Sequence, residues 1–174
     1  MYDCKAPVSV EYFSMCNRLV SRNVFERNVI LPFEGVNMWD DVGLCTRVRF
    51  YTRGTAVINK GFYHYNRQNE QSTTRRPLLE RAREQELCIS CIEDFFRKED
   101  SHDKYRLFLS YLRLVAAEDL FYYEPDIWRQ KFEGLKDDLW KLRKLYTTKQ
   151  LFKFYMLGCG GIIGKLVWKR FWKR

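Results

Sequence analysis

The chain has 174 residues and a formal net charge of +9, with 46% hydrophobic and 17% aromatic residues. This length predicts one domain with a sizeable core, and the composition excludes disordered, collagen-like and low-complexity chains. Because no apolar run of a signal peptide follows Met1, we expect a cytoplasmic protein whose six cysteines are reduced thiols.

The positive charge is concentrated at the C-terminal end. From Lys141 onward there are ten Lys and Arg residues and no Asp or Glu, so the rest of the chain carries 21 basic and 22 acidic residues. The basic character therefore belongs to a separate surface and says little about what the main body binds.

The first predicted helix covers residues 11–21. Four of its residues share one face: Tyr12, Cys16, Leu19 and Val20. Residues 28–32 are predicted to be extended, because Pro32 disfavours a helical conformation at Leu31.

A second helix is predicted over residues 39–51. Asn37 is a candidate N-cap, and Asp40 follows three residues later as in a capping box. Gly54 is expected to stop the helix. Its inward face carries three small or β-branched residues: Val42, Cys45 and Val48.

Two short strands are predicted next, over residues 56–58 and 62–66, with a break at Gly61. The alternation of a strand places Tyr63 on one face and His64 on the other. Residues 67–76 form a polar loop.

The remainder is predicted to be helical. Pro77 suits the first position of a helix that runs to about residue 97, and residues 104–120 form a largely apolar helix. Between residues 128 and 146, apolar residues alternate steps of four and three, which predicts a helix that packs on a partner helix. These residues are Trp128, Phe132, Leu135, Leu139, Leu142 and Tyr146.

The basic tail, residues 147–174, contains eleven uncharged residues at 154–164, too few for a membrane-spanning helix, which needs about twenty. Beyond them, Lys165, Lys169 and Lys173 recur every four residues among aromatic residues. This pattern favours a helix lying on an anionic lipid surface. The alternative is a C-terminal helix that packs on the core and exposes a solvated basic face. Nucleic-acid binding ranks last, because the chain contains no motif typical of nucleic-acid recognition.

The acidic pair Asp40-Asp41 lies in the first turn of the second predicted helix. Such a pair commonly complements the helix dipole, and one carboxylate can also serve as a general base held firmly at a helix end. Adjacent helical residues point about 100° apart, so only one of the two can face a cleft squarely.

The histidines and paired cysteines carry weaker signals. We interpret His64 as a histidine whose hydrogen-bonding groups are satisfied within an aromatic cluster, rather than as a ligand. Cys88 and Cys91 form a lone CxxC, and only His64 and His102 are available besides, so we expect two small apolar residues on a helix and no metal site.

Three motifs occur in an order that resembles a known family. They are Met15-Cys16-Asn17-Arg18-Leu19-Val20-Ser21-Arg22, Phe33-Glu34-Gly35-Val36-Asn37-Met38-Trp39-Asp40-Asp41, and Phe62-Tyr63-His64-Tyr65-Asn66-Arg67 followed by Ser72-Thr73-Thr74. Their order and spacing resemble the C-terminal, acceptor-side half of bacterial family 2 glycosyltransferases of the GT-A fold. The resemblance covers about residues 12–75 and implies a partial α/β fold, mostly helical in this chain, with a short strand region near 56–66.

The resemblance also implies roles for site residues. Asp41, the second member of the pair with Asp40, corresponds to the catalytic base that deprotonates the acceptor hydroxyl. Met38 and Trp39 would line the acceptor site. Two further residues, Arg67 and Asn69, lie where the family contacts the diphosphate; many members have a histidine at the position of Asn69.

The resemblance further implies an inverting, hexosyltransferase-type enzyme that moves a sugar from a nucleotide-sugar to a glycan or lipid-linked acceptor in surface polysaccharide synthesis. The complete enzyme would use Mn²⁺ or Mg²⁺, but no Asp-x-Asp metal motif occurs in this chain. We therefore expect a fragment without its donor-binding half, weak or inactive alone. It would comprise a partial catalytic core (1–76), a helical extension (77–146) and the basic tail, bound peripherally at the inner face of the plasma membrane. The alternative is a non-catalytic, membrane-peripheral interaction module.

Overall fold

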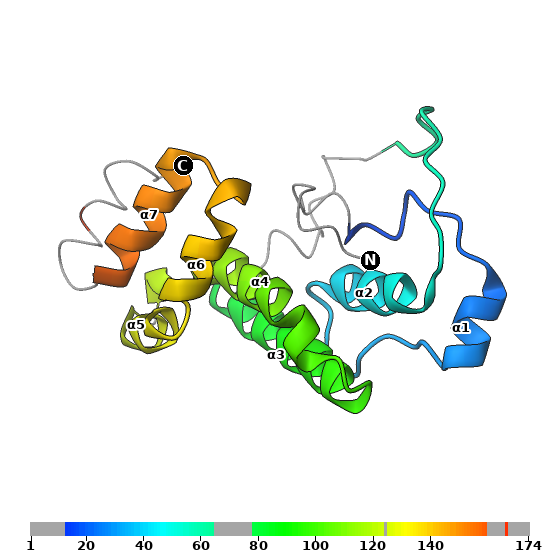
Figure 1. Ribbon diagram of the computed structural model, residues 1–174, viewed down its shortest axis with the longest axis horizontal. Coiled ribbons are helices and arrows are strands. Elements are labelled where there is room, and N and C mark those ends of the chain that lie inside the picture. Colours follow the sequence, from blue (N-terminus) through cyan, green and yellow to red (C-terminus); the bar gives the residue numbers. More distant parts are fainter. Residues whose placement is uncertain (1–12, 65–77, 124, 160–165, 167–174) are drawn as a thin grey trace.

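The computed structural model describes residues 13–64, 78–123, 125–159 and 166, and in these ranges the regular structure is helical (Figure 1). The elements run in the order α1 (Arg22–Asn28), α2 (Asp40–Tyr51), α3 (Leu78–Lys98), α4 (His102–Tyr123), α5 (Pro125–Glu133), α6 (Lys136–Leu142), the short 3-10 helix η3 (Arg143–Leu145) and α7 (Thr148–Cys159).

A hairpin of the two longest helices, α3 and α4, forms the centre of the molecule. Helix α2 packs on α3 and α1 packs on α2, while α5 and α6 pack on α4 and α7 packs on α5. In Figure 1 the hairpin crosses the middle of the view, with α1 and α2 on one side and α5 to α7 on the other. The hairpin therefore joins two groups of helices at its two sides.

The helical periodicity of α3 and α4 explains this hairpin. Ile89, Ile92 and Phe96 recur along one face of α3 and are almost fully buried, as is Leu109 on α4. The ring of Phe96 stacks on that of Tyr105 with centroids 4.3 Å apart. Full burial of one such apolar side chain contributes about 1.5–3 kcal/mol, so this contact face is the main source of stability for the centre.

The predicted α/β fold class is wrong for the described part of the chain, which contains no strand and no sheet. Residues 56–58 and 62–64 of the expected strand region, 56–66, have no regular structure, and residues 65–66 lie outside the described ranges. Val57 is 91% exposed and Phe62 is 64% exposed. Strand propensity reflects packing on neighbouring strands, and these residues contact no second strand within the described chain.

The helix predicted over residues 11–21 is also wrong from residue 14 onward. The chain there consists of turns and irregular segments, and Leu19, expected on the inward face, is fully exposed. Phe13 is the buried anchor of this segment instead. The chain becomes helical only at α1, which ends at Val29 with a φ of 49°, in the left-handed region.

The predictions of the other long helices are confirmed: α2, α3 and α4 begin and end within three residues of the predicted bounds. Helix α2 begins at Asp40, and all three residues expected on its inward face are buried: Val42, Cys45 and Val48. Trp39, not Asn37, occupies the N-cap position, and no side chain caps the helix, so the predicted capping box is wrong.

The apolar stripe predicted between residues 128 and 146 is divided between α5, α6 and η3. The break falls at Gly134, whose missing side chain lowers its helix propensity by about 1 kcal/mol relative to alanine. Phe132, Leu135 and Leu139 are all buried on either side of the break. The stripe therefore packs on α4 as expected, through two short helices rather than one.

The basic tail is described for residues 147–159 and 166. Thr147 and Gln150 form a capping box: the Gln150 amide donates to Thr147 Oγ1 at 3.2 Å, and the Thr147 amide donates to Gln150 Oε1 at 2.9 Å. The three lysines expected to face a lipid surface lie outside the described residues. Among the helices that the structure describes, none combines the length and the apolar character needed to cross a bilayer.

Candidate active site

The residues before α2 are held in place by α3. The backbone amide of Met38 donates to Glu84 Oε2 at 2.6 Å, and Cys88 Sγ donates to the carbonyl oxygen of Trp39 at 3.2 Å. Trp39 has a φ of 70°, a conformation that only a well-determined environment maintains in a residue other than glycine. Met38 and Trp39, both half-buried, therefore form a fixed wall beside the start of α2.

Close packing on Gly43 fixes the same loop at its other end. A Cβ atom on Gly43 would lie 2.8 Å from the nearest ring carbon of Phe33, so only glycine admits the ring at this distance. The guanidinium of Arg47, one turn further along α2, lies 3.9 Å from the centroid of that ring. Residues 33 to 43 are thus anchored on both sides of the acidic pair.

The acidic pair divides into one exposed and one half-buried carboxylate. Asp40 is exposed, while Asp41 is half-buried. Burial raises the pKa of Asp41 and the charge of Asp40 adds to this, whereas a hydrogen bond from the Met15 amide and the charge of Arg18 lower it; the net direction is upward. A raised pKa makes a carboxylate a better proton acceptor, which suits Asp41 rather than Asp40 to the work of a general base.

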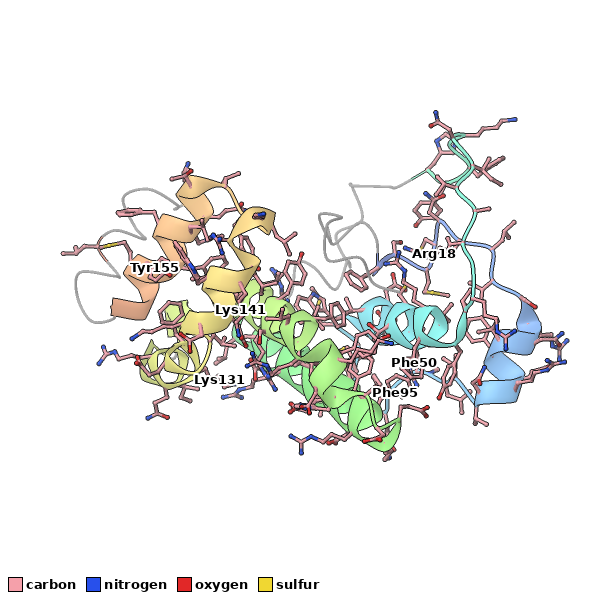
Figure 2. All side chains as sticks on the ribbon, viewed as in Figure 1. Arg18, Phe50, Phe95, Lys131, Lys141 and Tyr155 are labelled. Atoms are coloured by element: carbon pink, nitrogen blue, oxygen red, sulfur yellow. The ribbon has the colours of Figure 1, made fainter. Side chains whose placement is uncertain are left out.

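The segment that precedes α1 lies across the Asp41 face of α2. Cys45, one turn after Asp41, donates from Sγ to the carbonyl oxygen of Phe13 at 3.1 Å. Arg18 Nε donates to the carbonyl oxygen of Ser14 at 2.9 Å. Figure 2 shows Arg18 beside α2, on the side away from Phe50 and Phe95. A segment distant in sequence thereby brings the charge of Arg18 and the amide of Met15 near Asp41, where both lower the pKa of its carboxyl group.

Of the other candidate residues, His64 is described and is not brought to this place. His64 lies on the exposed, irregular segment after α2, together with Tyr63. Arg67 and Asn69, expected at the diphosphate, lie outside the described residues. The structure thus groups Met38, Trp39, Asp40 and Asp41 and leaves the diphosphate contacts as a prediction.

The described cysteines are free thiols; Cys45 and Cys88 are buried, whereas Cys16 is exposed. Burial raises the pKa of Cys88 to about 12, and that of Cys45 to about 11, so both are neutral near physiological pH. Across the described ranges, His, Cys, Asp and Glu side chains nowhere gather in the groups of three that a metal ion requires. The divalent metal implied by the resemblance therefore has no ligand set in this part of the chain, and we derive no reaction step through it.

A hollow of about 530 Å³ lies elsewhere, at the turn between α3 and α4. Tyr51, the last residue of α2, hydrogen-bonds Glu99 beside this turn at 2.7 Å. Asp41 is ten residues earlier on α2, about 15 Å away along the helix axis. The hollow is therefore not part of the Asp41 site; it is lined by Arg97, Asp100, His102, Asp103 and Lys104.

Sequence reasoning missed three groups that the structure places at this site. Arg18 and the Met15 amide belong to the first motif quoted above, but no spacing rule connects them with Asp41. Glu84 comes from α3, and only the fold shows that it binds the Met38 amide.

Comparison with known proteins adds no constraint on this site. The chain matches no family model, no curated protein and no solved structure.

Proposed function

We propose that the chain is the acceptor-side part of an inverting glycosyltransferase of the hexosyltransferase type. Such an enzyme moves a sugar from a nucleotide-sugar to a glycan or lipid-linked acceptor during surface polysaccharide synthesis. One observation carries the proposal: a half-buried carboxylate, Asp41, with a raised pKa, stands in the first turn of a helix beside a fixed wall of Met38 and Trp39. The three sequence motifs that resemble family 2 glycosyltransferases support the same assignment.

In the proposed reaction Asp41 accepts the proton of an acceptor hydroxyl. As that O–H bond breaks, the oxygen forms a bond to the anomeric carbon of the donor sugar. The bond from this carbon to the nucleoside diphosphate breaks with its electron pair, and the proton remains on the Asp41 carboxyl group. The rigid first turn of α2 suits this task, since a base must stay within hydrogen-bond reach of its hydroxyl.

The wall beside the base would orient the acceptor. The indole of Trp39 offers a flat apolar surface of the kind on which a sugar ring stacks, and Met38 offers an adaptable neighbour. Both are held by α3, so the position of the acceptor would not depend on a mobile loop.

The donor is assigned to a second protein surface. Arg67 and Asn69 are proposed diphosphate contacts, with Arg67 suited to a bidentate pair. A donor-binding half supplied by a partner would cover the exposed segment after α2, where Val57 and Phe62 are presented to solvent. Without this half, donor and acceptor are not held together, so slow or absent turnover is expected of the chain alone.

Peripheral attachment at the inner face of the plasma membrane is part of the same proposal. Its support is the basic, aromatic sequence from Lys141 onward, which suits binding to an anionic lipid surface rather than recognition of nucleic acid.

The test is a titration of the full chain with octyl glycosides as model acceptors, in which binding is monitored by nuclear magnetic resonance. We expect shifts at Met38 and Trp39, and a roughly fivefold weaker Kd for Trp39→Ala, because loss of one aromatic contact is worth about 1 kcal/mol. Asp41→Asn should bind as the wild type does. The matched control is Trp140→Ala, which removes a 60% exposed tryptophan of α6 and should not change the Kd.

A set of octyl glycosides that leaves Met38 and Trp39 unshifted would contradict the proposal. The second candidate function, a non-catalytic membrane-peripheral interaction module, would then be favoured, and the exposed apolar segment around Val57 already fits it. Transfer separates the two: once a donor-binding half, a nucleotide-sugar and Mn²⁺ are added, only the transferase turns over, and Asp41→Asn should abolish this turnover.

A further inference from the structure

Helix α7 carries aromatic side chains on two faces. On the inner face, Phe154 is almost fully buried, and its ring meets that of Tyr146 edge-on with centroids 5.2 Å apart. On the outer face, Phe152 is 54% exposed and Tyr155 is 40% exposed. These two residues are three positions apart, so they are neighbours on the helix surface. The packed face of α7 is therefore not the whole of its apolar surface.

The burial pattern of α7 is the reverse of that of a helix whose outer face meets only water. Lys153 is almost fully buried, while its neighbour in sequence, Phe152, is exposed. A surface helix normally directs its lysines outward and its phenylalanines inward. Figure 1 shows α7 at one end of the molecule, beyond α6 and far from α1 and α2. The outer face of α7 is thus open to a further partner.

The charge beside this face indicates which partner would cover it. Lys149, almost one turn before Phe152, is exposed, and so are Lys141 and Lys144 in the two elements before α7. No acidic residue follows Lys141 in the chain. Lysine is depleted in the cores of protein–protein interfaces, whereas aromatic residues beside lysines are typical of helices that lie on anionic bilayers. The charge therefore favours a lipid surface over a second protein.

We propose that α7 lies along the surface of an anionic bilayer with Phe152 and Tyr155 inserted among the lipid headgroups. This inference rests on the membrane attachment in the proposed function and assigns it to one helix face. Tyr155 suits this place, because its ring is apolar while its hydroxyl can stay hydrated. Lys149 reaches the lipid phosphates from the same face, with its alkyl chain along the apolar layer. The Phe154 face keeps its contacts with the core, so binding requires no unfolding.

The test is flotation of the full chain with vesicles of phosphatidylserine and phosphatidylcholine in equal amounts. We expect Phe152→Ser to bind them roughly five- to tenfold more weakly, because about half of the phenylalanine side chain is available to leave water. The matched control is Phe62→Ser, which removes a 64% exposed phenylalanine from the segment after α2 and should bind as the wild type does. Vesicles of phosphatidylcholine alone should bind the wild-type chain more weakly. Equal binding by the two variants, or binding that ignores phosphatidylserine, would overturn the proposal.

A second measurement uses the wild-type chain alone. In anionic bicelles that contain a headgroup spin label, the ring protons of Phe152 and Tyr155 should broaden more than those of Phe62. Broadening that does not distinguish the two places refutes the proposed orientation. Sedimentation velocity without lipid tests the other occupant: a dimer that Phe152→Ser dissociates would assign the face to a second copy of the chain and overturn the proposal.

The vesicle test and the acceptor test fail separately. Glycoside shifts at Met38 and Trp39, together with equal vesicle binding by Phe152→Ser and Phe62→Ser, would leave the acceptor site standing and remove the α7 face. A loss of vesicle binding in Phe152→Ser without glycoside shifts would keep the lipid-binding face and favour the interaction module. A wild-type chain that binds no anionic vesicles would remove the membrane attachment and the α7 face together.

Discussion

Asp138 ties α6 to the central hairpin, and its removal should destabilise the protein strongly. Its Oδ2 accepts hydrogen bonds from Ser110 Oγ at 2.7 Å and Arg106 Nη1 at 3.2 Å, and Arg106 Nη2 lies 2.8 Å from Oδ1. Asp138 and Ser110 are almost fully buried, whereas the Arg106 side chain is 48% exposed.

The expected cost of Asp138→Ala follows from these contacts. A hydrogen bond to a charged group contributes roughly 1.5–3 kcal/mol, and a buried hydroxyl left without an acceptor costs about 1–3 kcal/mol. The half-exposed Arg106 side chain becomes hydrated by water in the variant and so adds little to the cost. The expected destabilisation therefore lies near the lower end of the summed range, at about 3 kcal/mol. Asp138→Asn keeps an acceptor for Ser110 and should cost about half as much.

The assay is urea unfolding followed by far-ultraviolet circular dichroism, with Asp137→Ala as the matched control. Asp137 lies in the same first turn of α6 but is exposed, so its replacement should stay within about 0.5 kcal/mol. A double-mutant cycle of Ser110→Ala with Asp138→Ala isolates the buried hydrogen bond. The reasoning is refuted if Asp138→Ala costs no more than Asp137→Ala, or if the cycle shows no coupling.

Three further outcomes can be checked. Burial alone would raise the pKa of Glu93, but Arg113, Arg97 and His102 make the net direction downward; stability should therefore fall as pH drops below about 4.3, and Glu93→Gln should lose this acid dependence in urea unfolding. Gly43→Ala should lower Tm despite a helix-propensity gain of about 1 kcal/mol, because displacing Phe33 costs roughly 1–3 kcal/mol. Exposed Cys16 should react with iodoacetamide before buried Cys88, as read by peptide mass spectrometry.

Each of these has a contrary result that is easy to recognise. A Glu93→Gln variant with the acid profile of the wild type would place the acid-sensitive group elsewhere. A higher Tm in Gly43→Ala would mean that the Phe33 ring moves aside without loss. Alkylation of Cys88 as fast as Cys16 would show that the contact between α2 and α3 opens readily.

The helices were predictable where buried residues recur at helical spacing over several turns. The apolar steps of α3 and the inward face of α2 extend over several turns, so one wrong residue does not change the prediction. The segment 11–21 is too short for such a pattern to repeat. Its apolar residues suggested a helix, yet of its described apolar residues Phe13 is buried and Leu19 is fully exposed. Pattern alone could not show that the segment crosses α2.

The strand prediction failed for a different physical reason. Val57 and Phe62 have side chains that favour strands, but a strand is stabilised by its neighbours and not by its own residues. The site shows the same limit. Met38 to Asp41 are adjacent in sequence and could be proposed together, whereas Arg18 and Glu84 reach them only through tertiary contacts.

The end of α1 has a consequence for handling the protein in solution. Val29 holds a left-handed conformation although its side chain is 74% exposed, so it carries a steric cost of about 1–2 kcal/mol without much packing in return. Asparagine or glycine tolerates that conformation and commonly ends helices. Val29→Asn is therefore a background that should extend sample lifetime in long titrations, at a position outside the contacts described around Asp41.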